Sequence, residues 1–196
     1  MTKSPLSSAG HFHAVKFYEN RESLCRIVGE FLSEGLLRHE PALVIATPAH
    51  RDGIIHELSG HGFDVEAIQR IGDLLMLDAA DELDALMRDG MPDASLFSQR
   101  SGDVIKSLSH GRQHRPIRAY GGMVDILWKN NQEIASIRLE MLWNKLAATQ
   151  EFSLLCGYAM GNFYKDATLQ AIHHQHSHVV NATGLTGNAL RSTTLN

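Results

Sequence analysis

The segment PALVIATPAHRDGI, residues 41–54, decides the fold because a buried strand in it runs directly into a helix. Residues 42–47 are almost all apolar and lie between two prolines, which is typical of a strand covered on both faces in a parallel sheet. A helix is expected over residues 49–62, where glycines stop it. In many α/β proteins such a junction holds a phosphate, so its side chains and backbone donors decide whether it is a nucleotide site.

Strands and helices alternate along the whole chain. Apolar or alternating runs predict further strands at residues 13–18, 74–79, 117–122 and 152–160. Helices are predicted at residues 20–40, 81–93, 94–111, 123–150 and 166–180, with a break at Gly90-Met91-Pro92 between the second and the third. Asn130 and Asn131 are expected to break the fourth of these helices. This order predicts right-handed crossovers and an α/β fold, a three-layer sandwich with a mostly parallel sheet and helices on both faces.

Length and composition indicate an ordinary globular protein. The 196 residues suit one domain, which we place at residues 11–180, between a flexible leader at 1–10 and a tail or linker at 181–196. A formal net charge of -4 argues against direct nucleic-acid binding, which usually requires a basic patch. The N-terminus lacks the apolar region of a signal peptide, and no apolar run is long enough to span a bilayer. We therefore expect a cytoplasmic protein without membrane contact.

The junction at residues 41–54 lacks the parts of a phosphate-binding loop. A P-loop needs glycines and a terminal lysine so that consecutive N–H groups and an ammonium reach the phosphates, and the chain contains no GK dipeptide and no GxGxxG. Pro48 also removes one backbone donor. Two interpretations stay open: Thr47 and Pro48 simply start a helix, or His50 and Arg51 help its N-terminus to bind an anion.

Residues near the carboxyl ends of the strands form the expected ligand site, because ligands bind at that edge of a parallel sheet. Tyr18, Tyr120 and Tyr158 fall there, and a tyrosine can offer a ligand both an apolar face and a hydroxyl. Asp78 either caps the following helix or binds a metal ion through its carboxylate. The complete expected set is His13, Tyr18, Thr47, His50, Arg51, Asp78, Tyr120, Gly121, Met123 and Tyr158. Because the spacing yields no triad or carboxylate pair, we expect no enzyme activity.

Cysteines and histidines raise the question of a metal ion. Cys25 and Cys156 lie in apolar runs without a CxxC pair, which indicates buried free thiols in a reducing compartment. In the run HHQHSH at residues 173–178, His174 and His178 are one helical turn apart and could share a metal. The sequence fixes no acidic or cysteine partner nearby, so a polar helix face is the preferred interpretation, and we expect no metal and no cofactor.

Eight segments give the chain a resemblance to a known family. In order they are HAVKFYEN, ALVIATPAHR, LLMLDA, DGMPD, YGGMVDILW, LEMLWNKLA, FSLLCGY and HSHVV. Together they resemble the MEDS family, the methanogen/methylotroph DcmR-type sensory domain, over residues 11–180. The motif positions of the family correspond here to His13, Phe17, Tyr18, Thr47, Pro48, His50, Arg51, Asp78, Gly121, Met123, Trp128, Glu140, Leu142, Trp143, Cys156, Tyr158, His176 and His178.

The resemblance implies a RecA-like fold with a degenerate Walker A loop and a role in sensing. MEDS domains are cytoplasmic modules proposed to detect small organic molecules, and they are often joined to histidine kinases or DNA-binding regulators. We therefore expect a non-catalytic regulatory domain that binds a small organic ligand and signals to such a protein partner, with homodimer formation left open. A degenerate RecA-like nucleotide-binding protein or ATPase is the alternative. One departure is Gly122, which stands where the family commonly has glutamate.

Overall fold

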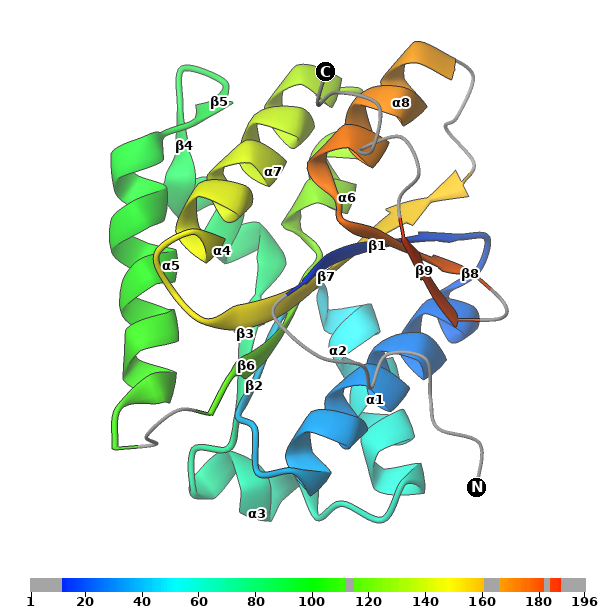
Figure 1. Ribbon diagram of the computed structural model, residues 1–196, viewed down its shortest axis with the longest axis vertical. Helices are drawn as coiled ribbons and strands as arrows, with labels where there is room; N and C mark the ends of the chain where they lie inside the picture. The colour runs from blue at the N-terminus through cyan, green and yellow to red at the C-terminus, as the bar shows by residue number, and fades with distance from the viewer. Residues whose placement is uncertain (1–11, 112–114, 161–165, 182–183, 188–196) are drawn as a thin grey trace.

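The computed structural model describes residues 12–111, 115–160, 166–181 and 184–187. The expected leader at residues 1–10 and the end of the expected tail, 188–196, lie outside this part of the chain. A mostly parallel sheet forms the central layer, and helices cover both of its faces (Figure 1). The three-layer α/β architecture predicted from the sequence is confirmed.

The sheet has the strand order β3-β2-β6-β7-β1-β8-β9. Its strands are β1 (His13–Tyr18), β2 (Ala42–Ala46), β3 (Leu74–Asp78), β6 (Ile117–Gly121), β7 (Phe152–Ala159), β8 (His178–Asn181) and β9 (Gly184–Gly187). All neighbouring strands run parallel except the β8–β9 pair. The strands β2 and β6 are buried along their whole length, which explains the unbroken apolar run of β2.

The helices are divided between the two faces of the sheet. They are α1 (Arg21–Leu37), α2 (Pro48–Gly60), α3 (Val65–Arg70), α4 (Ala79–Leu86), α5 (Ala94–Ser109), α6 (Met123–Lys129), α7 (Glu133–Ala147) and α8 (Asp166–Gln175). One hydrophobic cluster joins the sheet to α1 and α2, with Phe31 in it, and a second joins the sheet to α4 through α7, with Trp143 in it. Neighbouring β7 residues Leu154 and Leu155 belong to opposite clusters, as alternation along a strand requires.

Short polar residues set several helix ends. The Asn20 side chain caps α1 by accepting the N–H of Ser23. Asp78 caps α4 in the same way. Asn131 adopts a positive φ of 58° between α6 and α7, which confirms the predicted helix break there.

Two predicted helices are wrong at their carboxyl ends. The helix predicted from residue 81, with its break at Gly90-Met91-Pro92, already ends at Leu86, and a hairpin formed by β4 (Met87–Arg88) and β5 (Met91–Pro92) surrounds the predicted break. Asp89 and Gly90 form its two-residue turn with φ values of 51° and 77°, as expected of an Asp-Gly hairpin.

The last helix was also predicted too long. It was expected over residues 166–180 but stops at Gln175, and residues 178–181 instead pair as β8 with β1. Residues 184–187, which we assigned to the tail or linker, form the edge strand β9.

The connections diverge at the carboxyl edge of the sheet. β1 and β2 lead into α1 and α2 on one face, whereas β6, the neighbour of β2, leads into α6 on the other (Figure 1). Ligands bind at this kind of edge in open α/β sheets. In the described part of the chain, no helix combines the length and apolar character needed to cross a membrane.

Candidate functional site

A buried carboxylate, Asp125 in the first turn of α6, organises the carboxyl edge of the sheet. The Tyr18 hydroxyl at the end of β1 donates to its Oδ2 at 2.6 Å, and Lys129 Nζ lies 2.7 Å from the same oxygen. The backbone N–H of Ala159 at the end of β7 donates to Oδ1 at 2.9 Å. Asp125 is only 3% exposed, so these partners compensate a carboxylate removed from water. We call Tyr18, His50, Asp125 and Lys129 the carboxyl-edge cluster.

Two further contacts complete the carboxyl-edge cluster. Lys129 Nζ donates to the Tyr18 hydroxyl at 2.9 Å and lies 5.5 Å from the centre of its ring. The His50 ring stands edge-on to the Tyr18 ring at 5.9 Å. Burial raises the pKa of Tyr18, and the neighbouring Asp125 raises the pKa of Tyr18 further. Burial lowers the pKa of His50.

Arg51 and Asp78, both expected at the ligand site, bind each other. Arg51 Nη2 donates to Asp78 Oδ2 at 2.9 Å, and Asp78 Oδ1 accepts the N–H of Ala80 at 2.9 Å. The cap interpretation of Asp78 is therefore confirmed. Thr47 precedes α2 without a side-chain hydrogen bond to its first turn, and Pro48 occupies the first helical position.

The three tyrosines expected at one pocket do not converge. Tyr18 and Tyr120 belong to the hydrophobic cluster under α1 and α2, whereas Tyr158 belongs to the cluster under α7. Alternation along β7 places them apart, because Tyr18 pairs with Ala159, one residue beyond Tyr158. Tyr120 and Tyr158 are both fully buried, and burial raises the pKa of each well above its ordinary value.

Gly121 and Met123, also in the expected set, lie in the core. A Cβ built on Gly121 would stand 3.7 Å from both Cys156 Sγ and Trp143 Nε1, which are ordinary van der Waals distances inside the core. Met123 is 1% exposed and packs in the same hydrophobic cluster as Trp143.

A groove of about 600 Å³ lies between the start of α1 and the side of α2, and it begins beside the carboxyl ends of β1 and β2. Its lining is polar and of mixed charge. The lining residues are Arg21, Glu22, Cys25, Ala49, Asp52, Gly53, His56 and Glu57. The groove thus occupies the expected edge, but within the described chain it is lined by neighbours of the expected residues, such as Ala49 next to His50.

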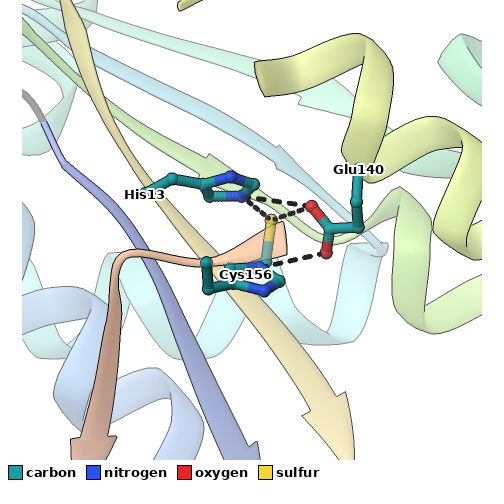
Figure 2. Close-up of side chains that lie close together, drawn as sticks. His13, Glu140 and Cys156 are labelled. Atoms are coloured by element: carbon teal, nitrogen blue, oxygen red, sulfur yellow. Dashed lines mark hydrogen bonds and ion pairs between the residues drawn. The ribbon is translucent and has the colours of Figure 1, made fainter. Parts of the chain in front are cut away.

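A second polar group lies inside the opposite face of the sheet. His13 from β1, Glu140 from α7 and Cys156 from β7 point toward one another (Figure 2), and His176, just after α8, completes the group. His13 Nε2 lies 3.1 Å from Glu140 Oε2 and 3.3 Å from Cys156 Sγ. His176 Nε2 lies 3.2 Å from Glu140 Oε1, and the two imidazole rings are 4.2 Å apart. We call these four residues the buried polar cluster.

Residues around the buried polar cluster hold its two imidazoles and its carboxylate by further hydrogen bonds. His13 Nδ1 lies 3.0 Å from Asn144 Oδ1, and His176 Nδ1 lies 2.8 Å from the carbonyl oxygen of Ile172. The Tyr158 hydroxyl donates to Glu140 Oε1 at 2.8 Å.

Burial and mutual charge set the ionisation of the buried polar cluster. Burial alone would raise the pKa of Glu140, but the charges and hydrogen bonds of His176 and His13 hold it below its ordinary value. Burial and the neighbouring His176 lower the pKa of His13. Burial raises the pKa of Cys156, and the Glu140 carboxylate raises it further.

Sequence reasoning included His13 in the expected site but missed its partners Glu140, Cys156 and His176. The resemblance had marked all three as motif positions without giving them a role. The pairing of His174 with His178 on one helix face is wrong, because α8 ends at Gln175. Cys25 and Cys156 are buried and free, as predicted.

The family model for the MEDS domain, described as MEthanogen/methylotroph, DcmR Sensory domain, matches residues 12–177. The chain belongs to the MEDS family. Membership supports a sensory or regulatory role for this domain. No curated protein matches the chain at a significant level.

Solved structures similar to this MEDS domain share its fold. The uncharacterised protein PH0321 from Pyrococcus horikoshii, solved with an unknown peptide, has a TM-score of 0.59 and 15% identity over 91% of this chain and 82% of its own. The flagellar accessory protein FlaH from Methanocaldococcus jannaschii has a TM-score of 0.54 and 11% identity over 89% and 73%. The KaiC-like protein PH0186 from Pyrococcus horikoshii has a TM-score of 0.56 and 12% identity over 90% and 76%. The fold is RecA-like, as expected.

Proposed function

We propose that this MEDS domain binds a small organic ligand at the carboxyl edge of its sheet and signals the binding to a protein partner, such as a histidine kinase or a transcription regulator. Family membership supports the sensory role. The observation that supports this location of the ligand site is the set of hydrogen bonds that Asp125 accepts. These bonds join the ends of β1 and β7 to α6 at the edge where open α/β sheets bind ligands.

The groove between α1 and α2 is the proposed entry for the ligand. Arg21 and His56 offer donors to it, and Glu22, Asp52 and Glu57 offer acceptors, which suits a small polar molecule. Next to the groove, His50 contacts Tyr18, and Tyr18 donates to Asp125 on the far side of β1. A ligand that binds one arrangement of α1 and α2 better than another shifts the equilibrium between the conformations of the carboxyl-edge cluster. The protein partner recognises the conformation that becomes more populated.

Thermal-shift measurements on the full chain test this proposal. We expect at least one member of a panel of small alcohols, aldehydes, amines, carboxylic acids and halogenated alkanes to raise Tm in a concentration-dependent way, because a ligand of the folded state stabilises it. Arg21→Ala and His56→Ala should each reduce that shift. Arg26→Ala is the matched control, because Arg26 lies on the same helix, pairs with Glu30 and does not line the groove. A panel without any stabilising ligand, or an equal shift in all variants, would contradict the groove as the site.

We further propose that the domain recognises its ligand without transforming it. The nucleotide alternative depends on Arg51 and Asp78, and the ion pair between them engages both groups at 2.9 Å. The proposed role therefore needs no phosphate contact from either.

A further inference from the structure

We propose that His13, Glu140, Cys156 and His176 bind a divalent transition-metal ion, with zinc as the first candidate. The four residues form the buried polar cluster, on the opposite face of the sheet from the α1–α2 groove. Imidazole, thiolate and carboxylate are the ligand types that zinc takes in proteins. This site does not depend on the ligand proposed for the groove.

The distances within the buried polar cluster fit a single ion. Ligand atoms bound tetrahedrally to zinc at about 2.0–2.3 Å are about 3.3–3.6 Å from one another. Here the measured separations are 3.1 Å from His13 Nε2 to Glu140 Oε2, 3.3 Å from His13 Nε2 to Cys156 Sγ, and 3.5 Å from Cys156 Sγ to Glu140 Oε2. One ligand atom from each residue lies within 4.8 Å of those of the other three. An ion therefore needs movements of only tenths of an ångström from most of its ligands.

The outer hydrogen bonds aim the ligand atoms inward. Asn144 Nδ2 donates to the carbonyl oxygen of Gln175 at 2.8 Å, so Asn144 Oδ1 faces His13 Nδ1 and accepts a hydrogen bond from its N–H. The Ile172 carbonyl can only accept, so His176 Nδ1 also carries a proton. Each neutral imidazole then presents the Nε2 lone pair to the cluster. Metal-binding histidines are held in this way by a carbonyl or amide oxygen on the outer nitrogen.

Charge favours a divalent ion over a network of hydrogen bonds alone. With neutral imidazoles, two Nε2 lone pairs and the Glu140 carboxylate face one another, and in the described part of the chain only the Cys156 thiol and the Tyr158 hydroxyl donate hydrogen bonds to Glu140. A divalent cation with one carboxylate and one thiolate leaves the cluster neutral, which removes the cost of a buried net charge. When the Sγ–metal bond forms, the thiol proton leaves to solvent.

Metal analysis and cobalt substitution test the site on the full chain. We expect the purified protein to carry close to one equivalent of zinc or another first-row metal by elemental analysis. After removal of the metal with a chelator, Co²⁺ should bind stoichiometrically and give a near-ultraviolet thiolate-to-cobalt charge-transfer band with visible bands of tetrahedral intensity. Zinc should displace it, and apparent affinity should fall as pH falls, because the ligands take up protons.

Matched variants assign the ligands. Cys156→Ser should abolish the charge-transfer band, whereas Cys25→Ser, which changes the other buried free thiol, should keep it. Glu140→Gln and His176→Gln should each weaken cobalt binding at least tenfold. Asn144→Leu should weaken it as well, because it frees the His13 ring without removing a ligand.

Measurements on the unchanged chain keep the proposal falsifiable even where a variant fails to fold. An unchanged protein that is folded by circular dichroism, carries no metal and binds neither cobalt nor zinc would overturn the proposal. A charge-transfer band that survives Cys156→Ser and disappears in Cys25→Ser would also overturn it.

Discussion

Two buried carboxylates, Asp125 and Glu140, organise the polar interior of this domain. Asp125 receives contacts from three other residues and Glu140 from four, and each carboxylate draws its partners from different elements of the fold. A buried carboxylate is weak evidence for stability, because its desolvation offsets much of what its partners contribute. Their common property is that each ties β1 and β7 to a helix of the α6–α7 segment. At the residue scale they are therefore the best candidates for function.

The pH dependence of stability should depend on His50. Its pKa is lowered from 6.5 by burial, and Lys129 and Arg21 lower it further against the opposing effect of Asp125. As pH falls through about 6.5, His50 becomes protonated in the unfolded chain but stays neutral in the folded chain. The free energy of unfolding should therefore fall by up to about 1.4 kcal/mol per pH unit for this group, until the folded pKa is reached. Urea unfolding at several pH values measures the slope.

His50→Gln should make the loss of stability between about pH 7.5 and pH 5.5 smaller by roughly 1 kcal/mol. The remaining slope comes partly from His173 and His178, whose pKa values burial also lowers. His56→Gln is the matched control, because His56 is an exposed histidine of the same helix. Equal slopes in the unchanged chain and in His50→Gln would show that His50 protonates as easily in the folded state as in the unfolded one.

At the element scale, the contact between α1 and α2 depends on Gly29. A Cβ built on Gly29 would stand 2.5 Å from Glu57 Cβ, closer than side chains approach one another. Gly29→Ala should therefore destabilise the fold by about 1–3 kcal/mol, despite the better helix propensity of alanine, because the two helices must move apart. Chemical denaturation measures the change in the free energy of unfolding.

Gly60→Ala provides the opposite case at the end of α2. A Cβ there meets no atom within 4 Å, so the substitution should be neutral or stabilise the fold by up to about 1 kcal/mol through the unfolded chain. If both variants shifted stability alike, the close approach at Gly29 would not constrain the two helices. A ligand of the groove should in addition bind Gly29→Ala more weakly, because Glu57 lines the groove.

The elements that the sequence misassigned are those in which tertiary pairing outweighed local signals. Residues 87–89 continue the helical pattern up to the predicted break at Gly90, but the Asp89-Gly90 turn closes a hairpin. Residues 178–180 likewise extend an amphipathic run, yet β1 offers them an open edge and they pair with it as β8. β2 was predictable because burial on both faces leaves an unbroken apolar run in the sequence.

At the scale of the whole molecule, the place of the candidate site was more predictable than its residues. The alternation of strands and helices was sufficient to indicate the carboxyl edge, where the groove and Asp125 lie. The buried polar cluster could not be predicted from spacing, because His13, Glu140 and His176 come from segments that only the folded sheet brings together. The side to which each strand-end tyrosine points depended on register, which a single residue reverses.

The whole molecule also keeps the layers of a RecA-like fold without a phosphate-binding loop. Pro48 removes a backbone donor at the start of α2, and Arg51 is bound to Asp78 at 2.9 Å. We therefore expect labelled ATP with Mg²⁺ to show no saturable binding at millimolar concentration and no phosphate release above a protein-free blank. Equilibrium dialysis and a phosphate assay measure the two quantities.

Arg51→Ala and Arg88→Ala separate this expectation from the nucleotide alternative. Both arginines pair with an aspartate, but Arg88 bonds Asp93 beside the β4–β5 hairpin. Because we expect triphosphate to bind at neither arginine, both variants should match the unchanged chain in ATP binding and in phosphate release. Saturable ATP binding that Arg51→Ala abolishes and Arg88→Ala preserves would instead mean that the Arg51–Asp78 pair opens to receive a nucleotide. The carboxyl edge would then bind phosphate, and a nucleotide would replace the small organic molecule as the proposed ligand.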